Sequence, residues 1–184
     1  LTAICISLGL VEETDSELIK KPISMLNALQ KVSDRILIFC EAGQIKAPSK
    51  PSPLCLLLEK MVVEVCLPYN QKINRFPAFH PKTWLMVYVN AEGKRLYRYI
   101  VLSRNLTFDR SWDVSLVLNG KPNCKSKKTE PIIDFTNFLK KQFLKDEPDI
   151  DRKRKIINSV LKELEEVTFD TDDKKFTGFQ IMPL

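Results

Sequence analysis

Two strand-forming segments separated by a short turn sequence restrict the fold of this chain more than any other feature. The first segment, HPKTWLMVYVN, covers residues 80–90, and the second, RLYRYIVLS, covers residues 95–103. Residues 90–94 between them read NAEGK, and a tight turn of this kind, with glycine, is typical of a β-hairpin. We therefore expect two antiparallel neighbouring strands, followed by a third strand in WDVSLVLNG, residues 112–120.

The N-terminal part of the chain alternates between strand-like and helix-like segments. Asp15 and Ser16 are expected to cap a helix that Pro22 interrupts or restarts, with Ile23 and Leu29 on its apolar face. The order strand, helix, strand, helix, strand is expected along residues 2–10, 15–32, 35–40, 54–60 and 61–67, with a loop at 42–53. This order favours an α/β fold with a mixed, mostly parallel central sheet and helices on both faces.

The C-terminal part is expected to be helical after a polar, lysine-rich loop at residues 122–130. Apolar residues recur at helical spacing in residues 131–145 and again in residues 149–167. The run DRKRK, residues 151–155, is expected on the solvated face of the second helix. The end of the chain, FTGFQIMPL, is typical of the beginning of a strand.

Length and composition place the chain in a broad class. Its 184 residues are enough for one domain with a hydrophobic core, and 44% of them are hydrophobic. No apolar run is long enough to span a membrane, so we expect no membrane partner. The net charge of +6 favours anionic partners such as nucleic acid, although a merely basic soluble protein remains an alternative.

The cysteines and the single histidine argue against a metal site. Five cysteines occur without a C-x-x-C spacing, and most lie in apolar segments, as in proteins of a reducing intracellular compartment such as cytoplasm or nucleus. With one histidine, no zinc site of the usual spacing can be assembled. We expect neither a metal nor another cofactor.

That single histidine, His80, lies two residues before Lys82 at the start of the first hairpin strand. Alternation along a strand directs both side chains to one face of the sheet. The antiparallel partner brings Ser103 and Asn105 beside them, so the four side chains can meet at one sheet edge. Such a group suits a phosphate: Lys82 and Asn105 would hold non-bridging oxygens, and His80 would attack phosphorus or protonate a leaving oxygen.

The pattern H-x-K, a hairpin and then S-x-N before a short polar turn resembles the signature of the phospholipase D superfamily, its HKD motif. The segment from Ala78 to Gly120, which includes DRSWD, is most similar to the tyrosyl-DNA phosphodiesterase branch and to bacterial phospholipase D-like proteins. The resemblance implies a half-domain of an α/β sandwich, with two halves for each active site. It also implies a metal-independent hydrolase in which His80 forms a phosphohistidine, Lys82 and Asn105 bind phosphate, and Ser103 supports them.

Three departures from the family pattern bear on activity. Val87 occupies the place of the superfamily's aspartate, an acid that the tyrosyl-DNA phosphodiesterase branch also lacks. Leu102 occupies the place of the usual glycine before S-x-N. One histidine cannot complete two-histidine chemistry, so either two chains meet as a homodimer or a second half follows in the same chain. The first residue, Leu1, and the apolar end favour the second option, which makes residues 1–184 a single domain and the N-terminal half of a longer enzyme.

Further charged and aromatic residues have two possible roles each. Asp109 and Asp113 either orient the imidazole of His80 or stabilise a turn and a strand. The aromatic side chains of Trp84, Tyr88, Tyr97 and Tyr99 either stack on bases or fill the core and sheet faces. Weaker candidates for contacts to a nucleic-acid backbone are Arg104, Arg110, Lys125, Lys127 and Lys128, for which a solvated loop is the alternative.

Three functions follow in order of preference. The first is a phosphodiesterase acting on nucleic acid, such as a nuclease or a DNA-repair enzyme that processes DNA ends, with DNA, single-stranded DNA included, as the expected partner. The second is a non-catalytic nucleic-acid-binding or dimerisation module with a degenerate site, since only one histidine is present. The third is a phosphodiesterase acting on phospholipid, for which no amphipathic basic segment stands out.

Overall fold

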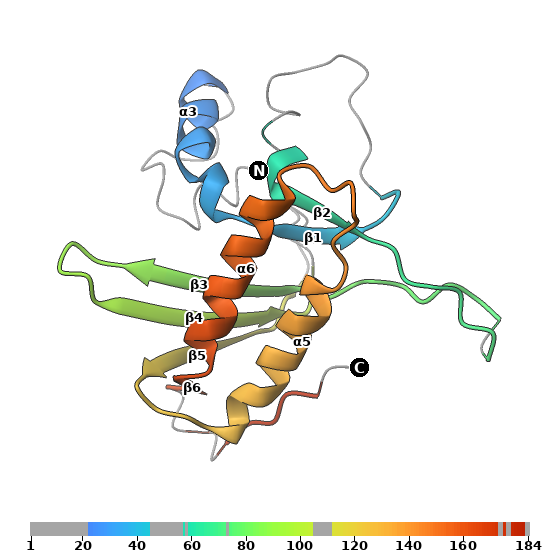
Figure 1. The fold of residues 1–184 in the computed structure, drawn as a ribbon. Coiled ribbons are helices and arrows are strands. Elements are labelled where there is room, and N and C mark those ends of the chain that lie inside the picture. Colours follow the sequence, from blue (N-terminus) through green and yellow to red (C-terminus); the bar gives the residue numbers. More distant parts are fainter. Residues whose placement is uncertain are drawn as a thin grey trace. The chain divides into compact units, whose positions relative to one another are not determined.

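The computed structural model describes most of the chain from Pro22 onward as two compact units (Figure 1). The first unit comprises Leu1–Phe79 and Gln142–Ile156, and the second comprises His80–Lys141 and Ile157–Leu184. The strand expected at residues 2–10, the helix cap at Asp15 and Ser16, and most of the loop at 42–53 lie outside the described residues. The described residues are 22–44, 57, 59–72, 74–104, 112–172, 175 and 178–182.

The first unit contains a short parallel sheet. Its elements are α3 (Pro22–Val32), the 3₁₀ turn η1 (Ser33–Arg35), β1 (Ile38–Glu41) and β2 (Val62–Val65). Strands β1 and β2 pair in parallel, with Ile38 opposite Val62, so the predicted parallel arrangement is confirmed for this pair. Leu29 of α3 is fully buried as expected, whereas Ile23 is 73% exposed and therefore does not belong to the apolar face.

Two basic side chains at the start of α6 (Ile150–Leu164) are fixed inside the first unit. The ammonium of Lys153, which is fully buried, donates to Glu147 Oε1 (2.6 Å), to the Val62 carbonyl (2.7 Å) and to the Glu59 carbonyl (3.3 Å). Arg152 donates to the carbonyls of Ser33 and Lys60. The prediction that residues 151–155 form a solvated face is therefore wrong for these two residues. Their donors satisfy carbonyl groups in η1, at the end of the helical segment before β2 and at β2 itself.

The second unit is an antiparallel sheet of four strands in the order β3-β4-β5-β6. The strands are β3 (Thr83–Val89), β4 (Arg95–Leu102), β5 (Ser115–Pro122) and β6 (Val167–Asp170). The predicted hairpin and third strand are confirmed, and Gly93 adopts a positive φ of 79° in the turn between β3 and β4.

The α/β class is confirmed, but the mostly parallel central sheet is wrong. The hairpin and the third strand pair only with antiparallel neighbours, and the fourth strand, β6, returns antiparallel to β5. The sequence pattern predicted a helix through residue 167, whereas α6 ends at Leu164 and β6 follows after two residues. The described residues 178–182 do not form the strand expected near the end of the chain.

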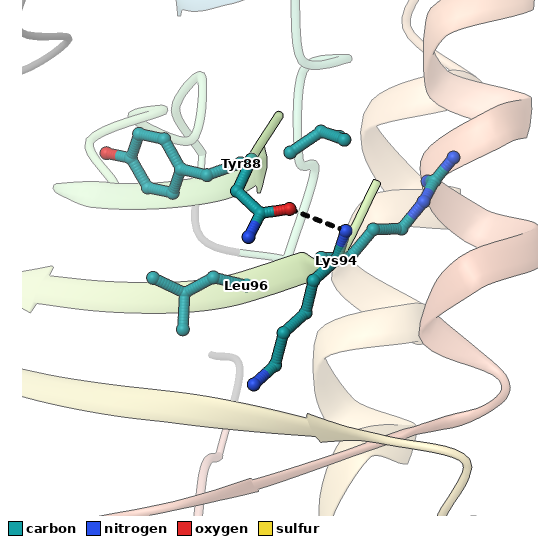
Figure 2. Close-up of a pocket in the computed structure, with 6 residues that line it drawn as sticks. Tyr88, Lys94 and Leu96 are labelled. Carbon is teal, nitrogen blue, oxygen red and sulfur yellow. Dashed lines mark hydrogen bonds between the residues drawn. The ribbon is translucent and has the colours of Figure 1, made fainter. Parts of the chain in front are cut away.

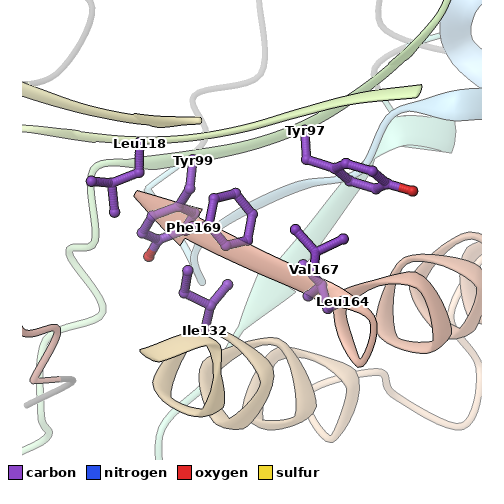
Figure 3. Close-up of a cluster of buried hydrophobic side chains, with 7 residues drawn as sticks. All are labelled: Tyr97, Tyr99, Leu118, Ile132, Leu164, Val167 and Phe169. Atoms are coloured by element: carbon purple, nitrogen blue, oxygen red, sulfur yellow. The ribbon is translucent and has the colours of Figure 1, made fainter. Parts of the chain in front are cut away.

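Helices α5 (Glu130–Lys140) and the end of α6 pack on one face of this sheet around a cluster of buried side chains (Figure 3). Ile132 of α5 and Leu164 of α6 are at most 1% exposed and point toward the strands. Gly120 on β5 leaves room for side chains of the neighbouring strands β4 and β6, because a Cβ at this position would lie 2.6 Å from Tyr97 Cβ and 2.7 Å from Val167 Cγ1. The cluster consists of Tyr97, Tyr99, Leu118, Ile132, Leu164, Val167 and Phe169.

A polar contact joins β4 to α6 at the border of this core. The Tyr97 hydroxyl donates to Glu163 Oε2 (3.0 Å), and the guanidinium of Arg95 forms an ion pair with Glu163 Oε1. Burial of Tyr97 and then its hydrogen bond to Glu163 raise the pKa of this phenol. Burial also raises the pKa of Tyr99. Both phenols are therefore held in the neutral form more strongly in the folded chain than in the unfolded chain.

Replacement of Lys153 by methionine should lower the free energy of unfolding by about 3–5 kcal/mol, because the carboxylate of Glu147 would remain buried without its counter-charge. The measurement is denaturant unfolding followed by circular dichroism. Lys155→Met, at an exposed position of the same helix, is the matched control. The double variant Lys153→Met/Glu147→Leu should regain most of the loss, and a single variant within about 1 kcal/mol of wild type would contradict the role given to the ion pair.

The two phenols predict a loss of stability at alkaline pH. A raised pKa in the folded state gives stability that is complete below the ordinary tyrosine pKa of about 10 and is lost as the pH rises through the folded-state value. The free energy of unfolding, measured by urea titration between pH 8 and 12, should therefore decline more steeply in wild type than in Tyr97→Phe. Tyr69→Phe, at a position that is 45% exposed, is the control and should leave the slope unchanged. Equal slopes for all three proteins would show that Tyr97 makes no such contribution.

Candidate functional site

His80 and Lys82 lie immediately before β3, and their side chains are in contact. The Lys82 ammonium is 2.8 Å from His80 Nδ1 and 3.3 Å from Nε2, and it also lies 3.4 Å from the His80 carbonyl oxygen. The imidazole is exposed and the lysine is partly exposed. The ammonium therefore lies close to both ring nitrogens rather than along the lone pair of one of them. The pair thus presents an imidazole and an ammonium group together at the surface.

Backbone hydrogen bonds bring the beginning of β3, the end of β4 and the beginning of β5 to the same end of the sheet. The Leu102 amide donates to the Lys82 carbonyl (2.8 Å), and the Ser103 amide donates to the Val114 carbonyl (2.9 Å). The register of the strands therefore places Ser103 at the His80 end of the sheet, as predicted.

The hydroxyl of Ser103 is used within the protein. It donates to Asp113 Oδ1 (3.0 Å) and accepts from the Val114 amide (3.0 Å). Arg104 Nε lies 3.6 Å from the same carboxylate oxygen of Asp113. Ser103 and Asp113 thus tie the end of β4 to the residues before β5. Of the two roles considered for Asp113, the contacts that we observe belong to the structural one.

Three predicted site residues, Asn105, Asp109 and Arg110, lie outside the described residues. The expected meeting of His80, Lys82 and Asn105 is therefore observed for the first two, and the position of the amide stays a prediction.

The lysine-rich loop lies at the opposite end of the sheet. Strand β5 starts at the His80 end and runs eight residues before this loop, a length of roughly 25 Å. Lys125 forms an ion pair with Glu166 (2.9 Å), which raises the pKa of the lysine, and the Lys128 ammonium lies 5.5 Å from the ring centre of Phe179. Lys127 is exposed in the short turn η2 (Lys127–Thr129). These three lysines do not adjoin the His80–Lys82 pair.

Two of the four aromatic residues considered for base stacking are core residues. Tyr97 and Tyr99 are each 4% exposed and belong to the buried cluster, so base stacking by these two is wrong. In contrast, Trp112 is fully exposed, two residues before Val114. The sequence prediction treated Trp112 as an ordinary strand residue, although its position directly after a polar turn was a signal that it could lie outside the sheet.

A shallow hollow of about 350 Å³ lies at the turn between β3 and β4 (Figure 2). It is lined by Tyr88, Val89, Asn90, Lys94, Arg95 and Leu96, and the Lys94 amide donates to Asn90 Oδ1 (2.7 Å). The hollow is largely apolar and lies at the end of β3 away from His80. It therefore does not contribute to the site at His80.

Neither a metal cluster nor a membrane-spanning helix is found in the described part of the chain. In that part, no three His, Cys, Asp or Glu side chains are grouped so that they could hold a metal ion. None of its helices is both long and apolar enough to cross a membrane. Comparison of the chain with protein-family models, with curated proteins and with solved structures finds no match.

The geometry of the pair predicts an anion site that His80 reports on directly. Because His80 is the only histidine, its ring gives one Cε1–Hε1 signal in a carbon–proton NMR spectrum. Added inorganic phosphate should shift this signal in a saturable way, since the ammonium of Lys82 would turn from the ring to a phosphate oxygen. Lys82→Gln should weaken this binding by about tenfold or more.

Lys94→Gln, at the far end of the hairpin, is the control for a general change in charge and should leave the affinity unchanged. A shift that does not saturate, or that is the same in both variants, would mean that the pair is no phosphate site.

Proposed function

We propose that this protein is a phosphodiesterase of the phospholipase D type that acts on nucleic acid. The observation that supports this best is the contact of 2.8 Å between the Lys82 ammonium and His80 Nδ1 at an open end of the sheet. A nucleophilic imidazole and a phosphate-binding cation are the two groups that the reaction needs first.

The proposed chemistry begins when a phosphodiester replaces the ring nitrogen as the partner of Lys82. The ammonium then binds a non-bridging oxygen and leaves the imidazole open to the phosphorus atom. His80 attacks phosphorus, so that a P–N bond forms while the P–O bond to the leaving group breaks. The leaving oxygen takes up a proton, and water later attacks the phosphohistidine to release the phosphate and the free imidazole. Asn105 would hold a second oxygen, and Ser103 would support the site through Asp113.

Nucleic acid is the proposed substrate because of the basic character of the sequence. The chain has a net charge of +6, and no aspartate or glutamate occurs between Glu64 and Glu92, a stretch that includes Lys72, Arg75 and Lys82. Such an acid-free basic stretch favours a polyanion, whose phosphates are bound without regard to sequence.

One observation favours a second candidate, a nucleic-acid-binding module without catalysis. The sequence contains one histidine, so it supplies one imidazole for a reaction that uses a nucleophile and a separate proton donor. In the first candidate, the donor comes from a second chain or from a second half. In the second candidate, only the phosphate contacts remain.

The two candidates differ in one measurement. A short single-stranded DNA with a 4-nitrophenyl ester on its 3′-phosphate needs little acid help, because nitrophenolate is a good leaving group. The chain should release one nitrophenolate for each protein molecule and should form an acid-labile phosphoramidate at His80, detected by mass spectrometry at alkaline pH. His80→Ala should abolish both signals, and Lys94→Gln should leave both unchanged.

A chelating agent should not reduce this single release of nitrophenolate, here called the burst, since the proposed reaction uses no metal. Loss of the burst on chelation, with recovery on addition of a divalent ion, would contradict the mechanism. A monomeric chain that turns over many equivalents would show that a proton donor other than a second histidine completes the site. DNA binding without any adduct would favour the second candidate.

A further inference from the structure

We propose that Trp112 is a stacking platform for a base of single-stranded nucleic acid next to the phosphate held by His80 and Lys82. The indole of Trp112 is 100% exposed, the highest value among the exposed large hydrophobic residues of the described chain, and Val114 beside it is 75% exposed. A large aromatic side chain that is fully hydrated gains free energy when a flat partner covers it. The inference rests on the proposed function, because it names the part of the substrate that lies beside the reacting phosphate.

The residues that follow Trp112 are fixed at the end of the sheet. Asp113 accepts a hydrogen bond from the Ser103 hydroxyl. The Val114 amide donates to the Ser103 hydroxyl, and the Val114 carbonyl accepts from the Ser103 amide. The amide of Leu102, the residue before Ser103, donates a hydrogen bond to the Lys82 carbonyl. A chain of short contacts therefore connects the residue after the indole to the proposed phosphate-binding lysine. The backbone directly after Trp112 is therefore held at the end of the sheet where Lys82 lies.

The separation also suits a nucleotide. Strands β3 and β5 are two strand spacings apart across β4, which is about 10 Å. Lys82 precedes β3 and Trp112 precedes β5, so the backbones that carry them start from these two strands, and a nucleotide next to the bound phosphate spans a distance of this order.

The charges at this end of the sheet indicate which class of partner fits it. Lys82 is positive, and the one acidic group of the anchored segment, Asp113, is engaged by Ser103 and lies near Arg104. An aromatic face and a cation at the same end of the sheet match the bases and phosphates of a single strand, in which stacking and phosphate contacts act together. An apolar protein partner would use the indole but not the adjacent cation.

The test uses the fluorescence of Trp112 itself. The chain has two tryptophans, so Trp84→Phe leaves Trp112 as the only one. This variant is titrated at low salt with oligothymidylate and, separately, with an abasic oligomer of the same length that has the same phosphates and no bases. We expect saturable quenching by oligothymidylate and little quenching by the abasic oligomer, because stacking requires the base.

Affinity is measured in parallel by fluorescence anisotropy of a labelled oligothymidylate. Trp112→Ala should weaken binding by about 5- to 100-fold, as expected for the loss of one stacking aromatic, and Trp112→Phe should recover part of it. Val89→Ala, at another exposed apolar residue, is the control and should bind like wild type.

His80→Ala separates this inference from the proposed reaction. If this variant still binds and is still quenched while wild type forms no adduct, then the stacking role stands and the proposed catalysis fails. If the adduct forms in wild type but Trp112→Ala binds as tightly as wild type, then the stacking role fails and the catalysis stands. Equal quenching by the abasic oligomer would overturn the stacking role. Absence of quenching by either oligomer would overturn the stacking role as well and would indicate that the indole binds a partner other than nucleic acid.

Discussion

The backbone register of the β3-β4-β5 ladder is the constraint on which the candidate site depends. Thr83 lies opposite Val101, and Leu102 lies opposite Ser115, so three segments far apart in the sequence end at the same edge. A shift of one residue would move each side chain of a strand to the other face of the sheet. It would separate Lys82 from the end of β4 and would expose Tyr97 and Tyr99, which now fill the core. The burial of these tyrosines thus fixes the register, and the register fixes the site.

The sequence predicted those parts of the fold in which local signals and pairing agree. The hairpin followed from NAEGK and from strand-forming residues on both sides, because two antiparallel strands need only a turn between them. The parallel central sheet was wrong because the order of elements does not specify partners, and β1 finds only β2 among the described strands. β6 was missed because Val167 also continues the apolar spacing of the helix before it, so periodicity alone could not show where α6 ends.

The sequence likewise predicted those contacts of the candidate site that depend on strand spacing and on the hairpin. The contact between His80 and Lys82 follows from their spacing at a strand start, and their nearness to Ser103 follows from the hairpin. The engagement of Ser103 by Asp113 could not be predicted, since it depends on how two segments leave the sheet rather than on any pattern within them. Lys153 illustrates the same limit: in the sequence it is one of four adjacent basic residues, yet Glu147 and two carbonyl groups surround it in the first unit. Burial of a charge depends on acceptors from distant segments, which a charge run does not reveal.

A site with one imidazole has a particular physical consequence. In the proposed reaction, Lys82 would stabilise the charge on a phosphate and His80 would attack it, so the first P–O bond would break wherever the leaving group is stable as an anion. An alkoxide leaving group, such as a deoxyribose oxygen, is far more basic and needs a proton in the transition state. A strand stacked on Trp112 would then be bound and oriented, but the reaction would still require a proton donor. That donor would lie on the far side of phosphorus from His80, since attack and departure occur roughly in line.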